Sequence, residues 1–127
     1  MAILGIGTDI VKISRIKKIF EKYPEGFAER ILHKNELLVL ATHKSANTYI
    51  AKRFAAKEAV SKALGTGIAE GVSFQEIEIS NDKKGQPQLT LHGKTLAVSQ
   101  ALGVTKNFIS LSDEKKYAIA YVILEGD

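Results

Sequence analysis

A charged helix that is apolar on most of its sides constrains this chain more than any other feature. The segment from Arg53 to Gly65, RFAAKEAVSKALG, consists mainly of good helix formers and contains no proline. At about 100° per residue its apolar side chains do not gather on one face, which predicts a helix enclosed by the rest of the protein. A charge held in such a place needs a partner. That partner is another side chain, a metal ion or an anionic ligand.

The composition limits the classes of protein to which the chain can belong. With 127 residues, of which 45% are hydrophobic, residues 1–127 are expected to form one domain with a core of ordinary size. The absence of cysteine excludes disulfides, thiolate metal sites and thiol catalysis. The first residues do not resemble a secretion signal, and no apolar run approaches the length of about 20 residues that a membrane span needs. A cytoplasmic protein without a membrane partner is therefore expected.

Hydrophobic periodicity and turn residues predict an α+β fold, with helices early and an antiparallel sheet late. A buried strand is expected at Ala2–Ile10, followed by an amphipathic helix that ends at Pro24-Glu25-Gly26. The remaining predicted helices are 27–32, 34–42, the long helix 46–64 and 93–102, and the remaining strands are 74–80, 88–92, 108–112 and 117–124.

Two carboxylates are candidates for a shared metal ion. Asp9 follows Gly5-x-Gly7 near the end of the first predicted strand, where an Asp is either a turn former or helix cap, or a ligand. Mg²⁺ is typically held by one or two carboxylates together with water and substrate phosphates. Glu58 is the only carboxylate on the enclosed helix, so Asp9 and Glu58 are the predicted pair.

The cations of the enclosed helix favour an anionic ligand. Glu58 and Lys62 are four residues apart, which by itself suits a simple ion pair on a helix. Arg53 and Lys57 have the same spacing, however, and like charges at that spacing repel. A pyrophosphate bridged by Mg²⁺ would satisfy this set of charges.

The net charge of +4 suits an acidic partner of any kind. The first helix carries a basic stripe, formed by Lys12, Arg15, Lys18 and Lys22. One hypothesis is therefore a non-catalytic basic module that binds RNA or an acidic protein, although the few aromatic residues weaken the case for base stacking. The histidines His33, His43 and His92 share no metal-ligand spacing and are expected to be incidental surface residues.

Several motifs, in this order, resemble the small bacterial 4′-phosphopantetheinyl transferases known as holo-[acyl-carrier-protein] synthases. They are Gly5-Ile6-Gly7-Thr8-Asp9-Ile10-Val11, Phe27-Ala28-x-Arg30-Ile31-Leu32 with Glu36, Arg53-Phe54-Ala55-Ala56-Lys57-Glu58-Ala59 with Lys62, and Lys84-Gly85-Gln86-Pro87. The resemblance covers essentially the whole chain. It implies a Mg²⁺-dependent transfer of 4′-phosphopantetheine from coenzyme A to a serine of apo acyl carrier protein, in fatty acid biosynthesis, with release of adenosine 3′,5′-bisphosphate.

The resemblance also implies roles for residues. The metal would lie on Asp9 and Glu58, with Glu58, Lys62 and Glu36 as the catalytic residues. The coenzyme A residues would be Arg53, Ser61, Lys62, Gly65, Thr66, Gly85 and Pro87, and Arg15 and Arg30 would face the carrier protein. A homotrimer with active sites at the subunit interfaces is expected, and no nucleic acid is expected as partner.

The general base stays open between Glu36 and a water ordered by a metal-binding carboxylate. The chain departs from the family pattern at Ser110-Leu111-Ser112-Asp113, where many members have Ser-x-Ser-His. Asp113 cannot supply the positive charge of a protonated histidine near a phosphate. A generic Mg²⁺ phosphohydrolase is a third hypothesis, which would release phosphate from simple esters without a carrier protein.

Overall fold

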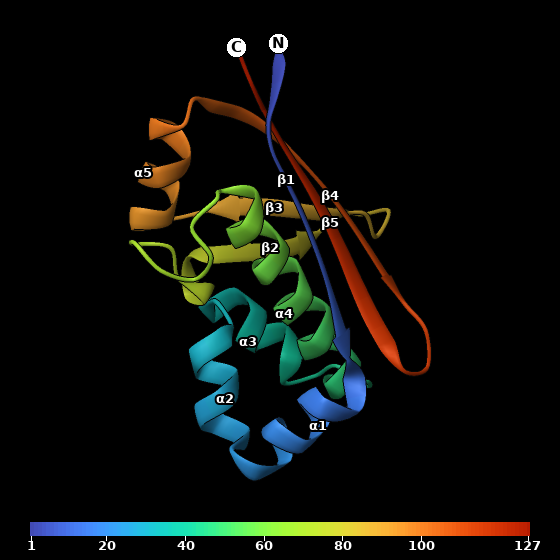
Figure 1. Cartoon of the computed structure of the whole chain (residues 1–127). Helices are drawn as coiled ribbons and strands as arrows, with labels where there is room; N and C mark the ends of the chain where they lie inside the picture. Colours follow the sequence, from blue (N-terminus) through green and yellow to red (C-terminus); the bar gives the residue numbers. More distant parts are fainter.

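The computed structural model describes all residues from Met1 to Asp127 and contains a three-stranded sheet, a separate hairpin and five α-helices (Figure 1). The strands are β1 (Ala2–Lys12), β2 (Ile77–Asn81), β3 (Pro87–Leu91), β4 (Val104–Asp113) and β5 (Tyr117–Gly126). The helices are α1 (Ile13–Lys22), α2 (Pro24–Ile31), α3 (Lys34–Leu40), α4 (Ala46–Ala63) and α5 (Gly93–Ala101), with a 3₁₀ turn at Phe74–Glu76. No helix combines the length and the apolar character needed to cross a bilayer.

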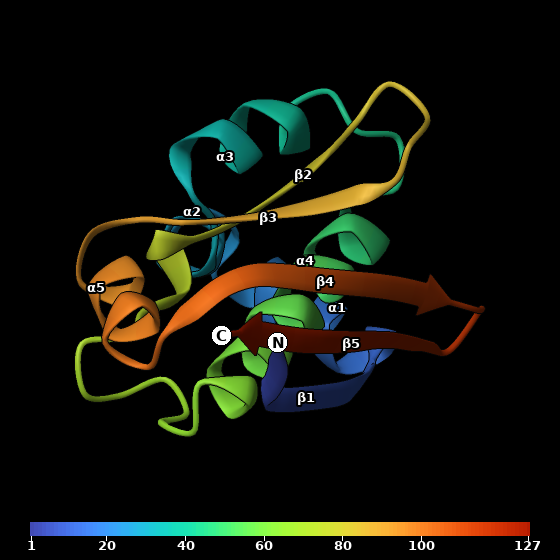
Figure 2. The ribbon, with the colours of Figure 1, turned by 90° about the horizontal axis from the view of Figure 1, so that it is seen from above.

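The long helix α4 lies between two antiparallel sheets, as the view from above shows (Figure 2). On one side is the larger sheet, in which β5 is the central strand and pairs with β1 and β4. On the other side is the hairpin of β2 and β3. This arrangement confirms the predicted α+β fold, and it explains why α4 has no single apolar face: the helix is covered on opposite sides.

Small residues allow α4 to lie close to the sheet. The inward side chains of β5 include Ala118 and Ala120, both fully buried. The inward positions of β1 include Gly5 and Gly7, where a Cβ atom would lie 2.0 Å from the carbonyl oxygen of Ala63 and 1.8 Å from that of Ala59. The two glycines therefore permit a close contact between helix and strand that no larger residue fits.

The structure corrects the predicted element boundaries at the start of the chain. β1 continues past Asp9 to Lys12, because it pairs with β5 as far as Tyr117. Asp9 thus lies within a strand, opposite Ala120, and is neither a turn former nor a helix cap. The first helix ends at Lys22, just before Pro24, as predicted. The next helix, predicted at 27–32, already begins at Pro24, since the fixed φ and missing N–H of proline suit the first helical position.

The outer face of the larger sheet is apolar and exposed, so the expectation that β1 is buried holds for one face only. Successive strand residues point to opposite faces, and the outward positions hold large hydrophobic side chains. They are Ile6, Ile10, Phe108, Ile119 and Tyr121, exposed by 57, 61, 50, 38 and 52% respectively. Together these five residues form the apolar outer face of the sheet.

Candidate active site

Asp9, Glu58 and Lys62 meet where β1 crosses α4. Inward-facing residues alternate along β1, so Asp9 points toward the helix two residues after Gly7. The Lys62 ammonium lies 3.0 Å from Asp9 Oδ1 and donates a second hydrogen bond to the carbonyl of Thr8, also at 3.0 Å. Glu58 precedes Lys62 by one helical turn and therefore shares its face of α4.

Asp9 and Glu58 are close enough to affect each other electrostatically. Partial burial raises the pKa of Glu58, the negative charge of Asp9 raises it further, and Lys62 opposes both effects. Two carboxylates beside one exposed ammonium leave an excess of negative charge. The structure thus brings the two carboxylates predicted from the sequence within electrostatic reach of each other.

The other two cations of α4 are held elsewhere, which corrects the expectation that all of them serve an anion. Lys57 is fully buried, and its ammonium donates to Glu36 Oε1 and to the carbonyls of Ile31 and Phe74. Burial lowers the pKa of Lys57, and Glu36 partly offsets that effect. All three ammonium donors have partners, so Lys57 is a structural residue.

Glu36, a predicted catalytic residue, lies buried among hydrogen-bond donors of the protein. Its side chain is 1% exposed, and its Oε1 atom accepts from Lys57 and from the backbone N–H of His33 at the start of α3. Its Oε2 atom accepts from the backbone N–H of Ile79. A carboxylate with both oxygens engaged and no access to solvent cannot take a proton from an incoming serine without disrupting these contacts.

Arg53 belongs to the hairpin side of α4 rather than to the Asp9 cluster. It donates to Asn81 Oδ1 at 2.7 Å and stacks on the ring of Tyr49, with 4.3 Å between the guanidinium carbon and the ring centroid. Asn81 in turn donates to the carbonyl of Gly85 at 2.9 Å. Arg53 Nε is buried without a hydrogen-bond partner, in contrast to most buried polar atoms.

Ser61, Gly65 and Thr66 form the end of α4. Ser61 is buried and donates to the carbonyl of Glu58 at 2.7 Å. Gly65 has a φ of +83° and ends the helix, and the backbone N–H groups of Thr66 and Gly67 return to the carbonyl of Ser61. These residues lie within two turns of Glu58, so they could extend a ligand site along the helix from Lys62.

Pro87, together with Gln86, lines a pocket of about 420 Å³ between the β2–β3 hairpin and β4, and Phe108 lies on its opposite wall. Neither Asp9 nor Glu58 reaches this pocket. Within one chain, the predicted coenzyme A residues thus lie in two groups. One group is near Lys62, and the other, at the hairpin, consists of Arg53, Gly85 and Pro87.

Arg15 and Arg30 are both exposed on neighbouring helices, α1 and α2. Arg30 borders an open hollow of about 540 Å³ whose other walls are Ile19, Tyr23, Gly26 and Phe27. A cation at the rim of an apolar hollow is suited to an acidic partner that also buries a hydrophobic side chain.

Sequence reasoning missed two interactions that depend on the fold. Asp113, which departs from the family pattern, pairs with Lys52 of α4 at 3.1 Å. His33 and His92 are half-buried, stacked on each other and close to Glu78, so they are not incidental surface residues. No local spacing signals either group, because its members come from different elements.

The comparisons with known proteins agree with one another. The chain matches the family model described as the 4′-phosphopantetheinyl transferase superfamily over residues 5–122. It is 53% identical over 126 residues to a holo-[acyl-carrier-protein] synthase of Photobacterium profundum, covering 99% of this chain and all of the relative. The crystal structure of the corresponding synthase of Neisseria meningitidis is 41% identical, with a TM-score of 0.93, and covers 98% of this chain and 99% of that one. A Bacillus anthracis synthase, in complex with coenzyme A (3′,5′-ADP), is 41% identical, with a TM-score of 0.84 and 98% of both chains covered.

Proposed function

The chain belongs to the 4′-phosphopantetheinyl transferase superfamily, among the holo-[acyl-carrier-protein] synthases, and we propose roles for its residues in the reaction. The reaction moves the 4′-phosphopantetheine arm of coenzyme A onto a serine of apo acyl carrier protein and releases adenosine 3′,5′-bisphosphate. This step serves fatty acid biosynthesis. The alternatives of a non-catalytic basic module and a simple phosphohydrolase gain no support from these relatives.

We propose that Asp9 and Glu58 hold Mg²⁺. The observation that carries this assignment is the contact between β1 and α4, where the Lys62 ammonium lies 3.0 Å from Asp9 Oδ1 and Glu58 precedes Lys62 by one helical turn. Their donor set is all oxygen, which Mg²⁺ favours over nitrogen or sulfur ligands. Mg²⁺ bound there would supply positive charge against the pyrophosphate of coenzyme A.

Lys62 is assigned to the transferring phosphate. Its side chain is half exposed, and its ammonium pairs with Asp9, from which it can turn to a phosphate oxygen. A lysine beside a phosphorus centre favours the extra negative charge that develops as the carrier serine attacks in line. Ser61, Gly65 and Thr66 lie farther along α4 and would bind the adjoining part of coenzyme A.

Of the two candidates for the general base, we favour a water ordered by a metal-binding carboxylate over Glu36. A metal-binding carboxylate can also hold a water molecule near the attacking serine. We assign Glu58 the role of ordering the water that accepts the serine proton. Glu36 contributes by holding Lys57, and through Lys57 the position of α4.

A homotrimer would explain two features that one chain leaves unexplained. The apolar outer face has no cover within the chain, and such a contiguous surface is typical of a protein interface. The predicted coenzyme A residues are also divided between Lys62 and the hairpin, so one subunit would supply the first group and a neighbour the second. Arg15 and Arg30 are assigned to the acidic carrier protein, and the cytoplasm remains the predicted location.

Mass spectrometry of an apo acyl carrier protein incubated with this protein, coenzyme A and Mg²⁺ tests these assignments. The expected product is a carrier protein heavier by one phosphopantetheine, formed with Mg²⁺ and absent when the metal is chelated. Asp9→Asn is expected to abolish the adduct while leaving the circular dichroism spectrum unchanged, and Glu114→Gln serves as the control in the exposed β4–β5 turn. Adduct formation by Asp9→Asn at the wild-type rate would contradict the metal assignment.

A further inference from the structure

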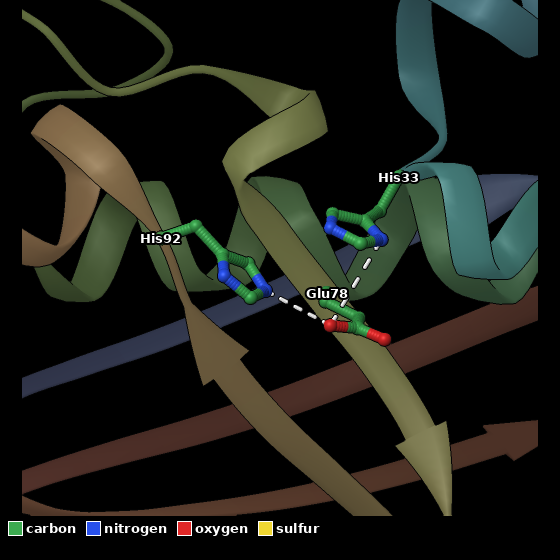
Figure 3. Close-up of side chains that lie close together, drawn as sticks. All are labelled: His33, Glu78 and His92. Carbon is green, nitrogen blue, oxygen red and sulfur yellow. Dashed lines mark hydrogen bonds and ion pairs between the residues drawn. The ribbon is translucent and has the colours of Figure 1, made fainter.

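Two histidines and one glutamate converge on a half-buried spot that the proposed reaction does not use (Figure 3). His33 directly precedes α3, Glu78 lies in β2, and His92 lies between β3 and α5. Glu78 Oε1 is 2.9 Å from His92 Nε2 and 3.9 Å from His33 Nδ1. The imidazole rings stack with centroids 4.7 Å apart and planes inclined by 19°.

We propose that His33, Glu78 and His92 form a site for a divalent transition-metal ion of the Zn²⁺ type, which clips α3, the β2–β3 hairpin and the start of α5 together. One ligand atom of each residue lies within 4.8 Å of the other two. Two imidazoles and a carboxylate are a ligand set that Zn²⁺ accepts and Mg²⁺ does not favour. Three protein ligands leave a fourth, tetrahedral position for water.

The observed spacing of the ligand atoms suits such an ion. Bond lengths of about 2.0–2.1 Å in tetrahedral geometry separate neighbouring ligand atoms by about 3.3 Å. The two separations from Glu78 Oε1, 2.9 and 3.9 Å, lie on either side of that value. In Figure 3 the contacts of His33 and His92 both lead to the Glu78 carboxylate, so small rotations of the two imidazoles would complete the site.

Asn35 supports the glutamate and sets the tautomer of one histidine. Its side-chain amide donates to Glu78 Oε2 at 3.0 Å, which leaves Oε1 turned toward the imidazoles. The backbone N–H of Asn35 donates to His33 Nδ1 at 3.1 Å, so Nδ1 carries a lone pair rather than a proton.

The same hydrogen bond limits the affinity. A metal ion on His33 Nδ1 has to replace the contact with the backbone N–H of Asn35, so binding is expected to be weaker than at a site with free imidazoles. His92 is 40% exposed and its face of the cluster is open to solvent, which gives the ion a path in.

Isothermal titration of metal-free protein with ZnCl₂, together with thermal unfolding with and without Zn²⁺, tests the proposal. His92→Ala removes the most exposed ligand, and His33→Asn removes an imidazole while keeping a residue type that caps helices well. His43→Ala is the matched control, because His43 Nδ1 also accepts a backbone N–H, from Ser45 at 3.0 Å, but has no carboxylate beside it. Each variant is also titrated with zinc after the substitution Asp9→Asn has been added to it. This second substitution excludes zinc bound at the proposed Mg²⁺ ligands.

The wild type and His43→Ala are expected to bind one Zn²⁺ at this cluster and to unfold at a higher temperature when it is present. Changes to groups that only support a metal ligand cost about 10–100-fold in affinity, so loss of a ligand in His92→Ala or His33→Asn is expected to exceed about 100-fold. The proposal is wrong if the wild type shows no saturable binding. It is equally wrong if His92→Ala and His33→Asn both retain the wild-type affinity, or if Asp9→Asn alone removes all binding.

Discussion

At the scale of single residues, Glu58 combines a proposed metal-binding role with a cost to stability. Its pKa is raised in the folded protein, so the folded state binds a proton at Glu58 more tightly than the unfolded state does. The contribution of Glu58 to stability therefore falls as the pH rises from its ordinary pKa through the raised value. At neutral pH the ionised carboxylate opposes folding, which is a common property of functional sites.

Glu58→Gln is accordingly expected to raise the melting temperature at pH 7 in Mg²⁺-free buffer. The gain should disappear near about pH 4, where the wild-type carboxyl is itself largely protonated. Differential scanning calorimetry at several pH values measures the effect, with Glu114→Gln as the control for loss of one charge. A Glu58→Gln variant that unfolds below the wild type at pH 7 would show that Lys62 outweighs Asp9 and burial.

At the scale of elements, the contact between β1 and α4 places the metal ligands. Gly7 allows the strand to touch the helix backbone at Ala59, one residue after Glu58, while Asp9 follows two residues later in the strand. The proposed metal site at Asp9 and Glu58 thus depends on Gly7 having no side chain.

Gly7→Ala is expected to destabilise the fold by at least about 1–3 kcal/mol, because its Cβ would lie 1.8 Å from a backbone oxygen that cannot move aside. It should also abolish transfer, since separation of β1 from α4 moves Asp9 away from Glu58. Gly26→Ala in α2 is the matched control, because no atom lies within 4 Å of its added Cβ. This variant should gain about 0.5–1 kcal/mol in free energy of unfolding. Urea unfolding compares the two, and equal stabilities would refute the close-packing argument.

The buried pair of Lys57 and Glu36 connects several elements of the fold. Through hydrogen bonds it joins α4 to the end of α2, the start of α3, the 3₁₀ turn and β2. Such a pair gains little over apolar residues of similar volume, but removal of one partner leaves a buried charge alone.

Glu36→Gln is therefore expected to cost about 3–5 kcal/mol of unfolding free energy, and the double variant with Lys57→Met should recover much of that loss. Asp113→Asn, which breaks the more exposed ion pair with Lys52, should cost less than about 1 kcal/mol. Denaturant unfolding curves of all three variants give the comparison. A double variant no more stable than Glu36→Gln would mean that the ionic contact itself is essential.

At the scale of the whole molecule, two features lead us to expect a trimer. They are the apolar outer face and the separation of the predicted coenzyme A residues into two groups. Tyr121 lies on the central strand of that face and is 52% exposed, so Tyr121→Glu would place a charge in the middle of the proposed interface. Sedimentation analysis is expected to show a trimer for the wild type and a monomer for this variant. The monomer should retain its secondary structure and lose coenzyme A binding, whereas a monomeric wild type that binds coenzyme A would contradict the proposal.

The basic surface of α1 and α2 concerns a partner rather than the fold. Arg15→Glu is expected to raise the KM for acyl carrier protein more than the KM for coenzyme A, and added salt should reduce the difference because surface charges are screened. Steady-state kinetics at low and high salt measure this effect. Arg53, which lies on the hairpin side of α4, is the position for comparison. Equal effects on both substrates at every salt concentration would contradict a carrier-docking surface.

The sequence by itself determined the long helix, the α+β class and the pairing of Asp9 with Glu58 as a hypothesis. Helix formers, turn residues and hydrophobic periodicity are local properties, so they are readable along the chain. The limits of β1 and α2 were less accurate, because pairing with β5 extends the strand and Pro24 suits a helix start as well as an end.

Only the tertiary structure decided which charges have partners. Lys57 and Arg53 look alike in the sequence, yet one is paired with Glu36 and the other with Asn81, 21 and 28 residues away along the chain. The histidines His33 and His92 meet for the same reason, at the junction of separate elements. Electrostatic and hydrogen-bond partners act over a few ångströms in space, and the distance along the chain does not reveal them.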